Sequence, residues 1–344
     1  MRIAVCAPQI PFVHGGAEIL AETLVSELQA RDHEAELVTV PFKWYPEARV
    51  LSQALLWRLL DLNESDGRSI DRVIATKFPA YAVRHPHKVV WLLHQFRQAY
   101  EYDRTELGQF GEAAFDRATV RAVQRLDRAV LGEAKGLFAT SQNVAARLER
   151  SIGLRAEVLP HPPQHLDYRC EGYGDFVLSV GRLDVAKRVD LLLKATALEA
   201  DSPVRVVVVG DGPDRDRLEE VARAQNLDGR VTFAGRVGAD ELTDLYARCL
   251  AVFYAPVDED FGMVPYEAFL AQKPVITTQD AGGPLEIVAD RRNGLICEPT
   301  PEAVATALGW LSSHREEAKT WGRAGRKAAL QVTWDAAIER LLSA

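Results

Sequence analysis

Cysteine is scarce in this sequence, and its distribution excludes a disulfide-rich scaffold. The 344 residues include four cysteines, which are far apart and have none of the spacings of a metal site: Cys6, Cys170, Cys249 and Cys297. The first and third of these lie in or beside apolar runs, where a small buried thiol is the expected role. We therefore expect reduced thiols and a cytoplasmic location.

The sequence also lacks a long apolar run and an excess of positive charge. No run approaches the roughly 18–20 apolar residues that a helix needs to span a bilayer. Residues 1–8 are too short and too quickly interrupted for a secretory signal, and they predict a buried strand. The net charge of −8 argues against nucleic acid as the main partner, because binding to phosphates usually requires a basic surface.

What the sequence does contain is a regular alternation of strands and helices. Residues 19–28 carry apolar side chains at helical spacing. Alternation of this kind is typical of parallel sheets that helices cover on both faces. The further strands that we predict are apolar and largely β-branched: residues 37–40, 72–76, 88–93, 136–141, 176–180, 204–209, 230–233, 251–254 and 274–277.

The length and one internal break indicate two domains. A chain of 344 residues is long enough for two cores. Prolines and glycines are concentrated in residues 160–175, which reads as a linker. We expect an α/β protein with two doubly wound Rossmann-like domains, residues 1–165 and 172–330, that face each other across a cleft. Ligands of such sheets bind at the carboxyl ends of the strands.

Two glutamates, Glu259 and Glu267, flank a loop and a helix start after the strand at 251–254. The residues at 261–264 between them are Phe-Gly-Met-Val, and Pro265 suits an early helical position because its missing N–H breaks no hydrogen bond. The amides of a helix N-terminus favour bound anions. Carboxylates accept hydrogen bonds from hydroxyls. The pattern therefore indicates a site for a phosphorylated sugar.

A cationic loop and several glycines accompany this acidic pair. Arg182 and Lys187 follow the strand at 176–180, in the sequence Gly-Arg-Leu with the lysine five residues after the arginine. Gly210 ends the strand at 204–209. A pair of glycines follows the strand at 274–277, and its members are Gly282 and Gly283. Fixed cations of this kind stabilise charge that develops on a diphosphate leaving group.

In this order the elements resemble those of the retaining glycosyltransferases with the GT-B fold, in family four (group 1), which use nucleotide sugars. The resemblance implies that Glu259 faces the transferred sugar and that Glu267 binds the ribose hydroxyls. Arg182 and Lys187 would grip the diphosphate. Further donor contacts would come from five residues: Gly210, Phe261, Gly262, Met263 and Val264. Gly282 and Gly283 would lie on the acceptor side, and a C-terminal helix at about 331–344 would pack back on the first domain.

The first domain carries further residues that the resemblance assigns to the site. Gly15 and Gly16 match a glycine loop that approaches the donor diphosphate, and glycine lets the backbone come close and adopt a positive φ. His94, at the end of the strand 88–93, would contact the transferred sugar. For Arg97 and Tyr100, a place in the acceptor pocket and a place on a helix surface are both open.

The resemblance implies transfer of a hexosyl unit from a nucleoside diphosphate sugar to a hydroxyl acceptor, with retention at the anomeric carbon. The acceptor class stays open between a glycan, a lipid-linked acceptor and a small molecule. The alternatives are a sugar-nucleotide epimerase of the same fold and a non-catalytic nucleotide-sugar-binding subunit. Neither the base nor the sugar is determined by the sequence.

Two further expectations concern metals and membranes. Asp258-Glu259-Asp260 could hold Mg²⁺ or Mn²⁺, but Arg182 and Lys187 already neutralise the phosphates, so we expect no metal and no cofactor. Residues 43–62 mix aromatic, basic and apolar side chains, including Leu55, Leu56, Leu59 and Leu60. Core packing is the favoured interpretation of these leucines. An amphipathic helix in peripheral contact with the inner face of the membrane stays open as the alternative.

Overall fold

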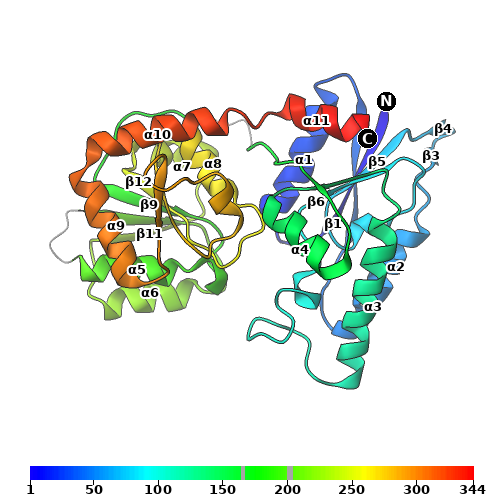
Figure 1. Ribbon diagram of the computed structural model, residues 1–344, viewed down its shortest axis with the longest axis horizontal. Coiled ribbons are helices and arrows are strands. Elements are labelled where there is room, and N and C mark those ends of the chain that lie inside the picture. The colour runs from blue at the N-terminus through cyan, green and yellow to red at the C-terminus, as the bar shows by residue number, and fades with distance from the viewer. Residues whose placement is uncertain (164–166, 200–203) are drawn as a thin grey trace. The chain divides into compact units, whose positions relative to one another are not determined.

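The computed structural model describes residues 1–163, 167–199 and 204–344, which form two compact units (Figure 1). Unit 1 comprises Met1–His161 and Thr333–Ala344, and unit 2 comprises Pro162–Val332. Residue 165, the predicted end of the first domain, lies outside the described residues. Each unit has a hydrophobic core of its own.

Unit 1 is built on a six-stranded parallel sheet with the strand order β2-β1-β5-β6-β7-β8. Every residue of β5 and β6 is buried, as expected for parallel strands that helices cover on both faces. The strands are β1 Arg2–Gln9, β2 Glu34–Pro41, β5 Arg72–Ala75, β6 Lys88–Leu92, β7 Gly136–Ala139 and β8 Glu157–Val158, with a separate antiparallel pair β3 Glu64–Ser65 and β4 Arg68–Ser69. The helices are α1 Gly16–Gln29, α2 Val50–Leu59, α3 Ala114–Leu131, α4 Gln142–Ile152 and α11 Trp334–Ser343.

Unit 2 repeats this architecture with the strand order β11-β10-β9-β12-β13-β14, again all parallel. Its strands are β9 Phe176–Val180, β10 Arg205–Val209, β11 Val231–Gly235, β12 Ala251–Phe253, β13 Val275–Thr278 and β14 Gly294–Cys297. Its helices are α5 Val189–Leu198, α6 Arg215–Ala224, α7 Ala239–Arg248, α8 Met263–Leu270, α9 Pro301–Ser313 and α10 Arg315–Ala329. The strand order reverses between β9 and β12, so the loops that follow these two strands are neighbours.

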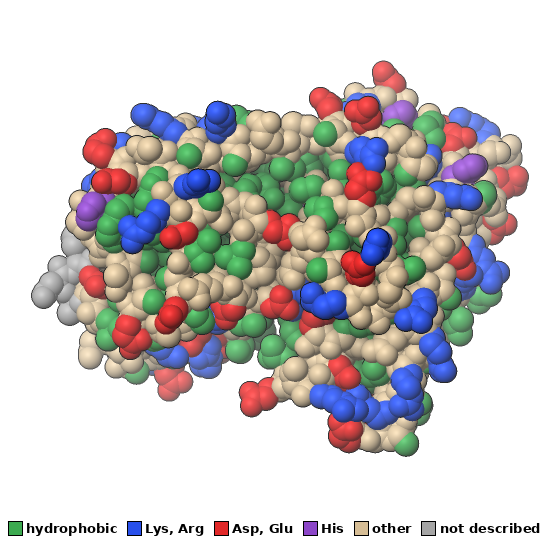
Figure 2. All heavy atoms as spheres, in the orientation of Figure 1, with side chains coloured by type: hydrophobic (Ala, Val, Ile, Leu, Met, Phe, Trp, Pro, Cys, Tyr) green, Lys and Arg blue, Asp and Glu red, His purple; other side chains and the backbone are tan. Residues whose placement is uncertain are grey.

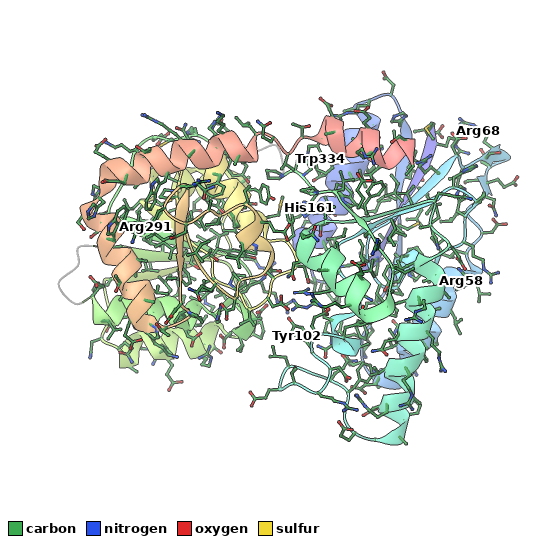
Figure 3. The ribbon with its side chains drawn as sticks, viewed as in Figure 1. Arg58, Arg68, Tyr102, His161, Arg291 and Trp334 are labelled. Carbon is green, nitrogen blue, oxygen red and sulfur yellow. The ribbon has the colours of Figure 1, made fainter. Side chains whose placement is uncertain are left out.

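Helix α11 returns to unit 1 after the whole of unit 2. Thr333 caps it, since its side-chain oxygen accepts a hydrogen bond from the Ala336 amide. Trp334 is buried in the same core cluster as Ile338 and Leu341, and its ring contacts that of Trp91 edge-on at 6.1 Å (Figure 3). The helix therefore completes the core of unit 1.

Helix α2 buries one face and exposes the opposite one. Val50 and Trp57 are fully buried, whereas three leucines on the other face are exposed by 55%, 49% and 81%: Leu55, Leu56 and Leu59. The favoured core packing of these three side chains is wrong, because a helix that points Val50 and Trp57 into the core turns them outward. Leu60 is partly buried against the core. Among the described residues, no helix has both the length and the apolar character to cross a membrane.

Candidate functional site

The predicted residues of unit 2 lie in loops at the carboxyl edge of its sheet. Arg182 and Lys187 follow β9, and Glu259 follows the neighbouring strand β12, so the reversal of strand order brings the two loops together. A backbone hydrogen bond of 2.8 Å from the Val257 amide to the Ala186 carbonyl joins these loops directly. Residues that are about 70 positions apart in the chain thus become neighbours at the position where ligands of such sheets bind.

Lys187, Glu259 and Tyr254 form a compact polar cluster at this edge. The Lys187 Nζ donates a hydrogen bond to Glu259 Oε2 and lies 3.4 Å from the Tyr254 hydroxyl, which donates to the same carboxylate oxygen at 3.1 Å. Burial acts to lower the pKa of Lys187, but Tyr254 and the Glu259 carboxylate raise it well above its usual value. The lysine is therefore a firmly protonated cation beside a partly buried carboxylate.

Arg188 holds the loop that carries Glu259 in place. Its guanidinium donates to the carbonyls of Ala255 and Pro256 at 2.8 and 2.9 Å, and it forms a bidentate pair with Asp280 at 2.9 and 2.7 Å. Burial alone would raise the pKa of Asp280, but hydrogen bonds from Arg188 and Thr278 lower it. Arg188 therefore joins the loops after β12 and β13.

The glycine pair Gly282 and Gly283 packs against the backbone of the Glu259 loop. The Gly283 amide donates to the Glu259 carbonyl at 2.9 Å, and the Glu259 amide donates to the Ala281 carbonyl at 2.8 Å. A Cβ at Gly283 would lie 2.7 Å from the Phe261 backbone, closer than real side chains approach, and Gly282 has a φ of +76°. Both positions require glycine to bring this turn beside Glu259.

A second glycine contact shapes the loop of Arg182. Gly210 has a φ of +128°, and a Cβ there would collide with the Gly181 carbonyl oxygen. The turn after β10 therefore lies directly on the loop after β9. Arg182 itself is exposed, and its guanidinium makes no hydrogen bond or ion pair in the part of the chain that the structure describes. Its guanidinium is available to an anion.

The residues at 261–264 contribute differently from one another. Phe261 and Val264 are 7% and 8% exposed and belong to a core cluster, and the Phe261 ring stacks on Tyr266 at 4.8 Å. Gly262 has a φ of +83° and precedes the first turn of α8, which begins at Met263. Backbone amides, rather than the two buried side chains, are the groups of this segment that can meet a ligand.

Glu267 lies in α8 with its carboxylate directed at the preceding helix. The Tyr246 hydroxyl of α7 donates to Glu267 Oε2 at 2.7 Å. Burial raises the pKa of Glu267, while the hydroxyls of Tyr246 and Tyr168 act to lower it. Sequence reasoning missed both tyrosines and Tyr254. Position at the end of a strand could have indicated Tyr254, but no local pattern indicates which side chain of α7 faces Glu267.

In unit 1 the glycines Gly15 and Gly16 lie at the start of α1. Neither has a positive φ, so that part of the expectation is wrong: Gly15 is extended at −146°, and Gly16 is the first helical residue. The Gly15 amide donates to Glu18 Oε2 at 3.0 Å, and Glu18 in turn pairs with Lys77 at 3.1 Å. A Cβ at Gly16 would meet no atom within 4 Å, so the backbone here is accessible.

His94, Arg97 and Tyr100 follow β6 but have different surroundings. The His94 Nδ1 lies 2.6 Å from the Gln95 carbonyl, which can only accept, so this nitrogen carries a proton and Nε2 faces away. Arg97 lies over the Tyr102 ring at 4.2 Å (Figure 3). The Tyr100 hydroxyl donates to the fully buried Asp127 at 2.8 Å, and burial raises the pKa of Asp127 to about 7. Tyr100 is thus engaged in the core of unit 1.

No group of three or more histidine, cysteine or acidic side chains within residues 1–163, 167–199 and 204–344 is arranged to hold a metal ion. The local acids Asp258 and Asp260 belong to a loop in which Asp258 has a φ of +46°. The site in unit 2 is a cation–carboxylate cluster joined to glycine turns and to the start of α8.

Comparison with known proteins finds a matching family for part of the chain. Residues 171–328 match the family described as glycosyl transferases group 1. A GDP-mannose-dependent alpha-mannosyltransferase of Mycobacterium tuberculosis is 33% identical over 169 residues, 47% of this chain and 40% of that relative. An uncharacterized glycosyltransferase of Methanocaldococcus jannaschii is 28% identical over 203 residues, 59% of this chain and 56% of that relative. The chain thus spans about half the length of these curated relatives.

Solved structures match the whole chain. A sucrose-phosphate synthase from Thermosynechococcus elongatus has a TM-score of 0.80 at 18% identity, covering 100% of this chain and 98% of that one. Anabaena HepE in complex with UDP-glucose has a TM-score of 0.74 at 17% identity, covering 100% and 99%. Residues 171–328 thus resemble the group 1 glycosyltransferases, and the chain has the GT-B fold.

Proposed function

We propose that this group 1 glycosyltransferase moves a hexosyl unit from a nucleoside diphosphate sugar to a hydroxyl acceptor, with retention at the anomeric carbon. The observation that carries the proposal is the meeting of Lys187 with Glu259 at the carboxyl edge of the unit 2 sheet. A cation suited to a diphosphate and a carboxylate suited to sugar hydroxyls stand together where ligands of this sheet type bind.

The charges of this edge suit the leaving group. Arg182, which is exposed and unpaired in the described chain, and Lys187 would bind the diphosphate. Negative charge grows on that group as the glycosidic bond breaks, so fixed cations stabilise the transition state more than the ground state. Because these two side chains supply the charge that a metal ion would otherwise provide, we propose that the reaction needs no added metal.

The carboxylates would hold the donor at two points. Glu259 would accept hydrogen bonds from hydroxyls of the transferred sugar, once the bound diphosphate competes for Lys187. Glu267 would bind the ribose hydroxyls, while the turn at Gly210 and the amides of 262–264 would approach the nucleotide. Held in this way, the donor phosphate helps remove the acceptor proton as the acceptor oxygen attacks the anomeric carbon from the leaving-group face.

We also propose ligand contacts for residues of unit 1. His94 would contact the transferred sugar, and the open backbone at Gly15 and Gly16 would approach the diphosphate. Arg97 of unit 1 and the glycines Gly282 and Gly283 of unit 2 would contact the acceptor.

The relatives indicate which donors to test first. The matched mycobacterial enzyme is named for GDP-mannose, and the matched Anabaena structure holds UDP-glucose. We therefore propose a UDP- or GDP-hexose as the donor.

A nucleotide-release assay with UDP- and GDP-hexoses tests the function. Incubation with the donors and a panel of glycan, lipid-linked and small-molecule hydroxyl acceptors should release nucleoside diphosphate, and proton NMR of the product should show the donor's anomeric configuration. Activity should persist in excess chelator. A second sugar nucleotide formed without an acceptor would instead identify an epimerase, and tight nucleotide binding without turnover would identify a binding subunit.

We also propose peripheral contact with an anionic membrane through α2. The exposed leucines Leu55, Leu56 and Leu59 belong to the same stretch of sequence, residues 43–59, as two exposed cations, Lys43 and Arg49. An apolar helix face beside basic side chains is the combination that binds the interface of anionic lipids.

A further inference from the structure

Glu267 is approached by two tyrosines from two different elements. The Tyr246 hydroxyl, on α7, donates to Glu267 Oε2 at 2.7 Å. Tyr168 lies on residues 167–174, which we call the entry segment because they lead into β9. Its ring contacts that of Tyr246 edge-on at 5.9 Å. Its hydroxyl is buried near the carboxylate but makes no hydrogen bond of normal geometry in the described part of the chain.

The entry segment is fixed to the body of unit 2. The amides of Glu171 and Gly174 donate to the carbonyls of Ala247 and Arg248, at the end of α7, at 2.9 and 2.8 Å. Lys273, fully buried, donates to the Gly172 carbonyl. Tyr168 therefore lies on a segment whose following residues, 171–174, are hydrogen-bonded to the α7 terminus and to Lys273.

The two hydroxyls oppose the effect of burial on Glu267. Burial favours the neutral carboxylic acid, which would donate rather than accept on one oxygen, whereas hydroxyl donors favour the carboxylate. The only titratable groups of the described chain that act on this carboxyl are Tyr246 of α7 and Tyr168 of the entry segment. Because Tyr246 occupies Oε2, the hydrogen bond to it also decides which way Oε1 points.

We propose that Tyr246 and Tyr168 are positioning residues for Glu267, which keep its carboxylate ionised and aimed at the ribose hydroxyls of the donor. Tyr246 holds one oxygen in the free protein. Tyr168 is the second donor, which engages the carboxylate when the ribose binds. The inference rests on the proposed function, and it adds two side chains from outside the loop–helix segment to the recognition of ribose.

The test measures nucleotide affinity of the full chain by isothermal titration calorimetry. UDP and GDP are compared with 2′-deoxy-UDP and 2′-deoxy-GDP, at pH 6.0 and pH 8.5. In Tyr246→Phe the ring packing remains, but a hydrogen bond to a charged group is lost, so affinity for the ribonucleotide should fall about tenfold at pH 6.0. The loss should be smaller at pH 8.5 than at pH 6.0, because a higher pH opposes the protonation of Glu267 that its burial favours, and discrimination against the 2′-deoxy form should diminish.

Tyr168→Phe should weaken ribonucleotide binding by a smaller factor and should also reduce the discrimination against 2′-deoxynucleotides. This second variant keeps the proposal testable if Tyr246→Phe folds poorly. Tyr173→Phe is the matched control, since it removes another partly buried tyrosine hydroxyl of unit 2, one that donates to the Gln272 carbonyl. It should leave the affinity ratio and its pH dependence unchanged. If Tyr246→Phe and Tyr168→Phe both kept the wild-type ratio of ribonucleotide to 2′-deoxynucleotide affinity, the inference about the two tyrosines would be wrong. The proposed function would not be affected by that result. If the wild type bound no nucleotide, the proposed function would fail with it.

Discussion

At the scale of single residues, Glu259 and Lys187 are each other's partner before any ligand arrives. Their pairing, with Tyr254 on the same carboxylate oxygen, keeps both charges in place at the carboxyl edge of the sheet. Pre-ordered charges of this kind need no reorganisation when the reaction begins. Under the proposed function, these side chains contribute to the rate through their position, and their removal should lower kcat.

Replacing Glu259 by Gln should lower kcat about a hundredfold while nucleoside diphosphate binds almost as before, because the side chain is assigned to the sugar rather than the nucleotide. Steady-state kinetics and calorimetry with the same donor measure the two effects. Asp216→Asn, which removes an exposed acid of α6, is the control. Unchanged kcat in the Gln variant would remove Glu259 from the site.

Replacing Lys187 by Met should lower kcat/KM about a hundredfold, because a cation that faces the diphosphate is lost. Lys187→Arg should restore part of the rate, since it keeps the charge but changes its shape. Measurement of kcat/KM for both variants tests whether the charge of Lys187 contributes to the reaction. Equal activity of the Met variant and the wild type would contradict the proposed role.

Arg188 shows how one residue can support a site without touching a ligand. Arg188→Ala should destabilise unit 2 by about 2–4 kcal/mol, because two backbone carbonyls and the Asp280 carboxylate lose a buried, charged donor. The thermal unfolding midpoint and kcat should fall together. Arg188→Lys should not restore either, since an amine cannot make the forked contact. A stable, fully active Ala variant would show that the two loops hold their own geometry.

At the scale of elements, α2 combines a buried face with an exposed one in a single ten-residue helix. The buried face, with Val50 and Trp57, ties it to the core, so the exposed leucines can change without loss of the fold.

The 344-residue chain should float with vesicles that contain anionic lipid and should remain unbound with neutral vesicles. Leu55→Ser combined with Leu59→Ser should abolish flotation with little change in the unfolding midpoint, because both side chains are exposed. A matched double substitution at exposed positions of α6, Asp216→Ser with Glu220→Ser, should float like the wild type. Wild-type protein that stays in the soluble fraction with anionic vesicles would refute the membrane contact.

The elements and the site differed in how far the sequence could predict them. Long β-branched runs identified β10 and β6, whereas the short strand β14 and the two-residue strand β8 were missed because they carry too few residues for a pattern. The loops with Lys187 and Glu259 were predicted from their residues and from the family resemblance. The tyrosines around Glu267 were not, since helix and entry-segment orientation is set by tertiary packing.

At the scale of the whole molecule, acidic residues outnumber basic ones, 49 to 41. On the face drawn in Figure 2, basic side chains are interspersed with acidic ones over both units, in keeping with a net charge of −8. Such a surface gives little long-range attraction to nucleic acid. The attraction for a diphosphate is instead local, at Arg182 and Lys187.

Unit 1 combines two separate stretches of the chain, whereas unit 2 is a single stretch, and this difference predicts how fragments of the chain fold. Unit 2 is continuous from Pro162 to Val332, so it should fold alone and bind nucleoside diphosphate without turnover.

A full chain with Trp334→Ala should lose about 3–5 kcal/mol of stability in unit 1, because a large side chain is removed from a packed core. Circular dichroism melts and calorimetry test both. An unfolded unit 2 fragment, or a Trp334 variant with unchanged melting, would contradict the assignment of the cores.

Helix α11 also sets the order of events on the ribosome. Unit 1 begins the chain, but the side chains that close its core, Trp334, Ile338 and Leu341, are translated only after all of unit 2. Until then Ile3 and Trp91 lack these partners, and the nascent unit 1 exposes the kind of apolar surface that chaperones hold. Unit 1 is therefore the later of the two units to finish folding, and a nascent chain stalled before Thr333 would carry a completed unit 2 and an incomplete unit 1.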